Sequence, residues 1–132
     1  MTDKQKFTHA YIVAMLWSTN DESDESGGEP LDANYNIEDI APEALASIER
    51  DCSAFYDAHV DTWTDQHKYG SSDGSTESEL AGHDFWLTRA GHGAGFWDGD
   101  WSEPAATKLT DACKAYSDQS PYVGDDDKIY LA

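Results

Sequence analysis

Apolar residues recur with helical spacing in three stretches of the chain. Residues 7–19 are mostly apolar, and residues 103–116 carry a shorter apolar stripe. The longest pattern lies in residues 37–63, where Pro42 suits the first turn of a helix. Its stripe has the alternating three- and four-residue spacing of one helix face and consists of Leu45, Ile48, Cys52, Phe55 and His59. We therefore expect three helices.

Two other stretches predict β-hairpins. In residues 82–101, the aromatic runs 85–89 and 95–98 flank a glycine-rich break, which is typical of two strands joined by a turn. Residues 122–131 repeat this pattern around a turn with three consecutive acids, Asp125, Asp126 and Asp127. The sequence thus predicts an α+β fold in which a small antiparallel sheet, formed by the two hairpins, packs against two or three helices.

The first of these hairpins is also expected to be the structural centre. Residues 82–101 contain three of the five tryptophans, and each buried aromatic side chain removes about 150–250 Å² from water. No other segment supplies enough apolar area to cover the long helix. We therefore expect Phe85, Leu87 and Phe96 to be buried against its stripe.

Two acidic stretches separate the predicted elements. Residues 20–30 contain five acids and no base, and residues 66–80 are rich in glycine, serine and acids. Such segments bury little apolar surface, so we expect mobile loops within a single domain that spans residues 1–132. Cys52 and Cys113 fall on apolar faces of predicted helices, where a lone cysteine is usually a small buried hydrophobe.

Acidic residues dominate the composition. Twenty-seven acids face eight bases, which gives a formal net charge of −19. The chain lacks the Lys and Arg that neutralise phosphates, the run of about 20 apolar residues that spans a bilayer, and the apolar segment of a signal peptide. We therefore expect a cytoplasmic protein that binds no nucleic acid or membrane directly, and that is attracted to basic protein surfaces.

One group of acids is regularly spaced. Asp57, Asp61 and Asp65 follow one another at intervals of four residues, which places them about 6 Å apart on the outer face of the long helix. Like charges at this spacing oppose the helix, so binding is one interpretation and a solvated face is the simpler one. With tryptophans as anchors, the predicted binding residues are Asp57, Asp61, Asp65, Asp98, Asp100, Trp97 and Trp101.

A metal centre is the alternative interpretation. The first hairpin would gather His83, His92 and Asp98, and His and carboxylate ligands suit zinc or manganese. Asp84 would then serve as a general base for metal-activated water. However, the spacing matches no established metal motif, and the same residues fit strand ends and a turn equally well. The main interpretation therefore includes no metal and no cofactor.

The string from His83 to Asp98, HDFWLTRxGHGxGFWD, resembles a family of small acidic proteins from bacteriophages and prophages. The resemblance extends more weakly to residues 11–17, 39–55 and 122–130, about half of the chain. It implies a phage origin and assigns no biochemical function. The sequence departs from the family at residues 99–101, where a basic residue is common, and at the third aspartate of the 125–127 turn, where glycine is common.

The leading hypothesis is a non-enzymatic, phage-type protein that acts in the host cytoplasm. It would bind a basic, nucleic-acid-binding host protein as a mimic of DNA and so inhibit host defence or DNA handling. A metal-dependent hydrolase is the alternative, and a third interpretation is that the acidity is an adaptation to high salt. The oligomeric state stays open, and a dimer is allowed.

Overall fold

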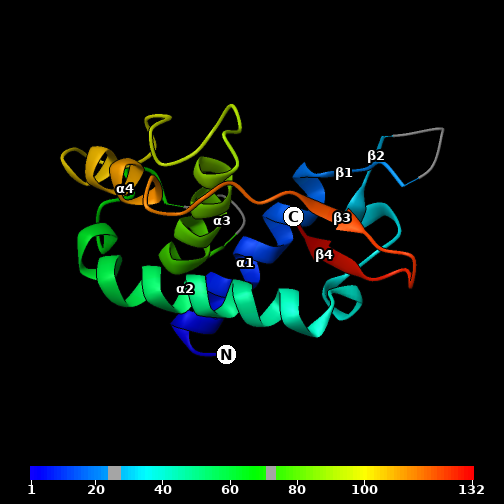
Figure 1. The fold of residues 1–132 in the computed structure, drawn as a ribbon. Helices are drawn as coiled ribbons and strands as arrows, with labels where there is room; N and C mark the ends of the chain where they lie inside the picture. The colour runs from blue at the N-terminus through cyan, green and yellow to red at the C-terminus, as the bar shows by residue number, and fades with distance from the viewer. Residues whose placement is uncertain (24–27, 71–73) are drawn as a thin grey trace.

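The computed structural model describes residues 1–23, 28–70 and 74–132, in which four α-helices and two short antiparallel sheets are found (Figure 1). The helices are α1 (Asp3–Ser18), α2 (Pro42–Trp63), α3 (Glu77–Arg89) and α4 (Ala105–Cys113). Strand β1 (Asn20–Asp21) pairs with β2 (Glu29–Pro30), and β3 (Pro121–Val123) pairs with β4 (Ile129–Leu131). The short 3-10 helices are Leu31–Ala33 and Ile37–Asp39. The predicted α+β class is confirmed, with helices dominant.

Helices α1 and α3 pack closely against each other at the centre of the molecule (Figure 1). The two backbones come close at Gly82, where a Cβ atom would meet the carbonyl oxygen of Phe7. Helix α2 runs along one side, from the β3–β4 sheet to α4 at the opposite end. Both sheets therefore lie at one end of the molecule, and α4 lies at the other.

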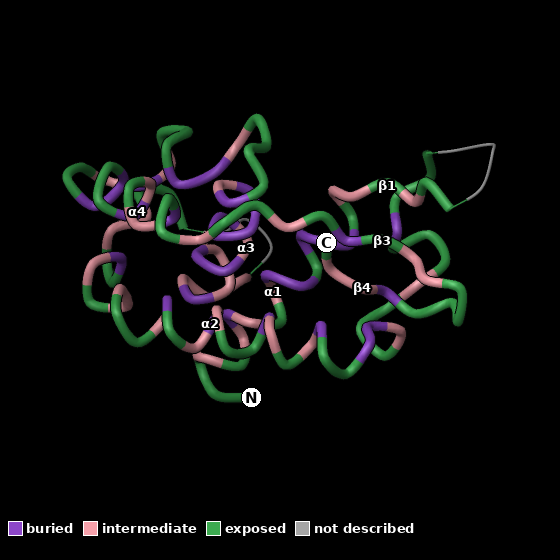
Figure 2. The backbone as a smooth tube through the Cα atoms, viewed as in Figure 1, coloured by how far each residue is buried: buried purple, intermediate pink, exposed green. Residues whose placement is uncertain are grey.

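The core is built largely from stacked aromatic rings. The ring centroids of Phe55 and Phe85 are 4.1 Å apart, and Phe7 stacks on Trp63 at 5.2 Å. Figure 2 shows the buried stretches of α1 and α3 at the centre of the molecule. The burial predicted for three residues is confirmed, since Phe85, Leu87 and Phe96 are all at most 1% exposed.

The predicted hairpin at residues 82–101 is not formed, because residues 85–89 belong to helix α3. Thr76 and Glu79 begin this helix with a capping box, in which each side chain accepts a hydrogen bond from the other residue's backbone N–H. Gly91, expected in a β-turn, follows the helix with φ of +70°. The N–H groups of Gly91 and His92 donate to the carbonyls of Thr88 and Leu87, which completes a Schellman motif.

The sequence of helix α3 resembles that of a strand because residues on almost every side of the helix are buried. Helices α1, α2 and α4 all pack against it, so apolar and aromatic side chains are needed on several faces. An alternating strand pattern and a fully enclosed helix are difficult to distinguish over five residues. The buried residues of α3 are Ser78, Ala81, Gly82, Asp84, Phe85, Trp86, Leu87 and Arg89.

The other predicted elements are largely confirmed. Helices α1, α2 and α4 lie within or overlap the three predicted stretches, and the hairpin β3–β4 lies within residues 121–131. The second acidic stretch, residues 66–80, is partly helical, because α3 begins at Glu77. In the first acidic stretch, residues 20–30, strands β1 and β2 occupy the two ends. The predicted mobility at residues 24–27 and 71–73 lies outside the described residues. The predicted sheet of two hairpins is wrong, because residues 82–101 form no hairpin; β3–β4 is a sheet of its own, and a second, separate sheet is formed by β1 and β2.

Both cysteines are buried, as predicted. Burial raises the pKa of the Cys52 thiol strongly and that of Cys113 to about 12. A thiol that stays protonated is a poor nucleophile, so both side chains serve as packing groups.

Candidate interaction surfaces

The predicted column of three acids on α2 is reduced to two. Asp57 and Asp61 are exposed on the helix, but α2 ends at Trp63. Asp65 lies beyond that end with φ of +65°, and its backbone N–H donates to Glu77 Oε1 at 2.8 Å. Asp57 is also partly neutralised, since its Oδ1 lies 2.8 Å from Lys4 Nζ. The predicted regular spacing therefore fails at Asp65, because the chain leaves the helix before it.

Asp98 and Asp100 shape the loop between α3 and α4. Asp98 accepts hydrogen bonds from the backbone N–H groups of Gly95 and Asp100, at 3.4 and 3.3 Å. The Asp100 carbonyl accepts from the Lys68 N–H at 2.8 Å, which ties this loop to the segment after α2. Partial burial, followed by the charge of Asp98, raises the pKa of Asp100. The predicted residues Asp65, Asp98 and Asp100 thus come from two adjoining loops.

The two predicted tryptophan anchors lie in opposite environments. Trp97 is 53% exposed and lines a hollow of about 140 Å³ with Glu103 and Asp111. Trp101 is only 1% exposed, and its Nε1 donates to Asp84 Oδ2 at 2.7 Å. Trp101 is therefore part of the core and cannot act as an anchor without unfolding. We refer to Asp65, Trp97, Asp98 and Asp100 as the Trp97 surface.

The structure gives no support to the metal group of His83, His92 and Asp98, because the hairpin that would gather them is not formed. His83 stacks on the Trp17 ring and His92 meets it edge-on, with ring centroids 5.8 and 5.9 Å away. Across residues 1–23, 28–70 and 74–132, no three His, Cys, Asp or Glu side chains form a group that could hold a metal ion. Asp84, the predicted general base, is buried beneath Trp101.

Arg89 is the centre of a buried polar network that the sequence did not predict. Its Nη1 lies 2.9 Å from Asp51 Oδ2 and 3.3 Å from the Tyr11 hydroxyl, and its Nε donates to the Ser117 carbonyl at 2.8 Å. The guanidinium also lies over the Tyr116 ring, 5.3 Å from its centroid. These contacts join α1, α2 and α3 to the segment after α4. Arg89 is thus a structural residue and is not available to a ligand.

A further acidic surface lies at the opposite end of the molecule, on the hairpin β3–β4. Tyr122 and Tyr130 are directly opposite each other in the sheet, and their rings stack with centroids 5.9 Å apart. The Tyr130 hydroxyl donates to Asp126 Oδ2 at 2.6 Å. This bond raises the pKa of Tyr130 to about 12 and lowers that of Asp126. The signal in the sequence is the symmetric placement of the tyrosines about the 125–127 turn.

Comparisons of the chain with family models, curated proteins and solved structures found no match. None of the helices in the described part of the chain is long and apolar enough to cross a membrane. Because a fold alone does not determine a function, the functional argument rests on the surfaces themselves.

Proposed function

We propose that the protein binds a basic surface of another protein as a mimic of DNA. The observation that carries this proposal is that nearly all of the described acidic side chains lie at the surface. The sequence has 27 acids, and 24 of them are described once Asp24, Glu25 and Asp73 are set aside. Among these 24, Asp84 is the one that is buried. The acids therefore form the surface of an ordered domain, and this supports an electrostatic role.

The eight bases offset only a small part of this negative surface charge. Arg89 is buried beside Asp51, and Lys4 and Lys114 form ion pairs with Asp57 and Asp111. A strongly negative surface attracts basic proteins over a distance of about 10 Å at moderate salt, and the attraction weakens as salt is added. The natural partners of such a surface are proteins whose grooves bind nucleic acid, because those grooves are lined with Lys and Arg.

The Trp97 surface is our proposed contact region. It combines carboxylates on an ordered scaffold with one large exposed indole, and aromatic side chains of this kind dominate the binding energy of many interfaces. Asp57 and Asp61 are proposed to contribute separately, from the exposed outer face of α2. The resemblance of residues 83–98 to phage proteins supports a partner in host defence or DNA handling. In this proposal the protein inhibits that partner without catalysing a reaction.

The test is capture from a bacterial lysate at low salt on the immobilised protein, followed by elution with duplex DNA. The expected result is retention of a DNA-binding protein that duplex DNA displaces. Trp97→Ala should weaken this capture, whereas Ile37→Ala should not, since Ile37 is 38% exposed but lies before the start of α2, at the opposite end of that helix from Asp65. The proposal fails if no DNA-binding protein is retained or if duplex DNA does not release it.

A further inference from the structure

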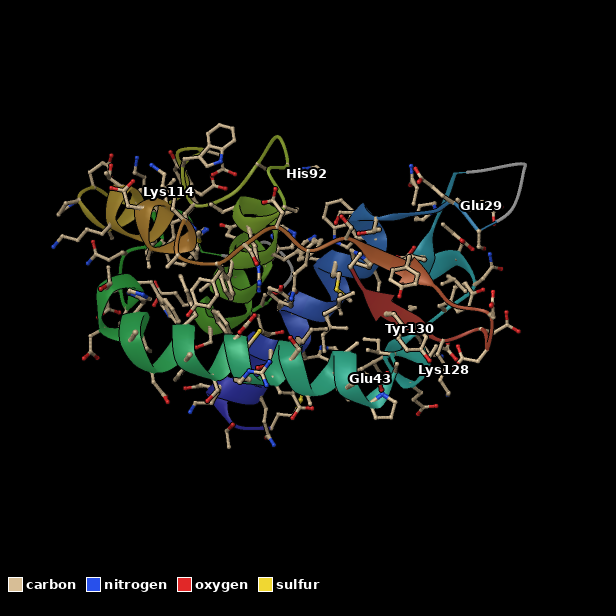
Figure 3. All side chains as sticks on the ribbon, in the orientation of Figure 1. Glu29, Glu43, His92, Lys114, Lys128 and Tyr130 are labelled. Atoms are coloured by element: carbon tan, nitrogen blue, oxygen red, sulfur yellow. The ribbon has the colours of Figure 1, made fainter. Side chains whose placement is uncertain are left out.

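The outer face of the β3–β4 hairpin carries two stacked tyrosines at the end of the molecule opposite α4 (Figures 1 and 3). Tyr122 is 48% exposed, so a partner that covers the hairpin would bury its ring. Tyr130 is held in place by its bond to Asp126 and by Gly124, where a Cβ atom would meet the Tyr130 ring. The pair is thus a fixed and accessible aromatic surface.

Three separate hollows surround this pair, and each one combines a tyrosine with two carboxylates. Tyr130 lines a hollow of about 430 Å³ with Glu43 and Asp118. Both tyrosines line a second hollow of about 430 Å³ with Asp125 and Asp126. Tyr122 lines a third, of about 180 Å³, with Asp21 and Glu22. Among the described residues that line these three hollows, none is Lys or Arg.

We propose that this tyrosine surface, defined by Tyr122, Tyr130 and the six carboxylates of the three hollows, binds arginine side chains of a basic protein segment. A guanidinium group is flat, so it can stack on a tyrosine ring while its N–H groups donate to a neighbouring carboxylate. Each hollow offers both partners at once. The inference goes beyond DNA mimicry, because it uses the opposite end of the molecule and needs no nucleic-acid-binding partner.

Charge and geometry favour this occupant over three others. A nucleic acid could stack on the tyrosines, but six carboxylates would repel its phosphates. A second copy of the chain would bring a net charge of −19 against an equal charge. Lysine would gain the charge attraction, but its compact ammonium group lacks the planar fork of arginine. The surface should therefore distinguish arginine from lysine, and this preference provides the test.

The experiment compares two fluorescent peptides of equal length and charge, one with arginines and one with lysines separated by glycine and serine. Their affinities are measured at low salt by fluorescence anisotropy. We expect the arginine peptide to bind about two- to fivefold more tightly, the range of an exposed cation–π contact. Tyr122→Leu should reduce this preference, and Tyr122→Leu combined with Tyr130→Leu should remove it and leave the charge-driven affinity. Tyr69→Leu, a matched loss of an exposed tyrosine, should retain it.

Two further variants keep the test independent of folding defects. Tyr122→Phe preserves the ring and should retain the preference for arginine, even if Tyr122→Leu lowers the melting temperature. Asp125→Asn should weaken arginine binding more than Asp61→Asn does, although each removes one charge. Equal affinity for the two peptides would overturn the proposal, and so would an equal loss of preference in Tyr122→Leu and Tyr69→Leu. Because only the peptides are used, either result leaves the capture experiment on the Trp97 surface unaffected.

Discussion

Phe96→Ala should sharply destabilise the protein. The Phe96 side chain is 0% exposed, and its ring lies 6.0 Å from Phe55 and 5.7 Å from Trp101. A buried aromatic side chain that removes about 150 Å² from water contributes roughly 4 kcal/mol at about 25 cal/mol per Å². This agrees with the 3–5 kcal/mol that replacement of a core Phe by Ala typically costs. For a chain of this length, the melting temperature should fall by roughly 10–20 °C.

The neighbouring residue provides a matched control. Trp97 is larger than Phe96 but 53% exposed, so Trp97→Ala should change the free energy of unfolding by about 0.5 kcal/mol or less. Both variants are measured by thermal melting followed by near-ultraviolet circular dichroism. If Phe96→Ala melts like the parent protein, or if Trp97→Ala lowers the melting temperature as much as Phe96→Ala does, the loop that contains Phe96 and Trp97 is not packed as described. The core argument would then be wrong.

Two further results are expected. Gly82→Ala should cost several kcal/mol in urea unfolding, since its methyl group would meet the Phe7 carbonyl, whereas Gly93→Ala, with open space around it, should be nearly neutral. In an ultraviolet titration, Tyr130 should ionise near pH 12, and Asp126→Asn should lower that pKa towards 10. Because the folded pKa is the raised one, the Tyr130–Asp126 bond stabilises the protein fully below pH 10 and is lost as pH rises through 12.

The sequence predicted those helices that bury one face. Helix α2 shows this most clearly, because its stripe at Ile48, Cys52 and Phe55 is buried and its outer face carries exposed acids. Helical periodicity is informative only where solvent covers part of the helix. In α3 the same rule fails, since residues on several sides are buried. The start of α3 was nevertheless present in the sequence, as the capping pair Thr76 and Glu79.

The aromatic content of residues 82–101 correctly predicted that these residues are buried, but the predicted secondary structure, a β-hairpin, was wrong. Phe85 and Phe96 do meet the α2 stripe at Phe55, but through a helix and a loop. The loop folds back on α3 through the Phe96 N–H, which donates to Thr88 Oγ1 at 3.0 Å. Hydrophobic area indicates that a residue is buried, whereas the element that buries it depends on local hydrogen bonds of this kind.

The candidate binding residues were harder to predict, because exposure is decided by packing partners distant in the sequence. Trp97 and Trp101 are four residues apart and both follow an acidic or glycine-rich stretch. One is exposed, and the other finds the buried carboxylate of Asp84, 17 positions away in the sequence. Composition alone cannot separate them. The tyrosine pair was more accessible to prediction, since a hairpin about the 125–127 turn places Tyr122 opposite Tyr130.

Adaptation to high salt remains the competing explanation of the acidity, and the two explanations differ in what they require. Hydration at high salt needs carboxylates exposed to water, but it does not need aromatic rings among them. At the β3–β4 end, each of three hollows places tyrosine beside two carboxylates, and Trp97 is exposed between Phe96 and Asp98. Exposed aromatic rings cost free energy in water and gain it in an interface. Their recurrence beside acids therefore favours recognition of cationic side chains over hydration alone.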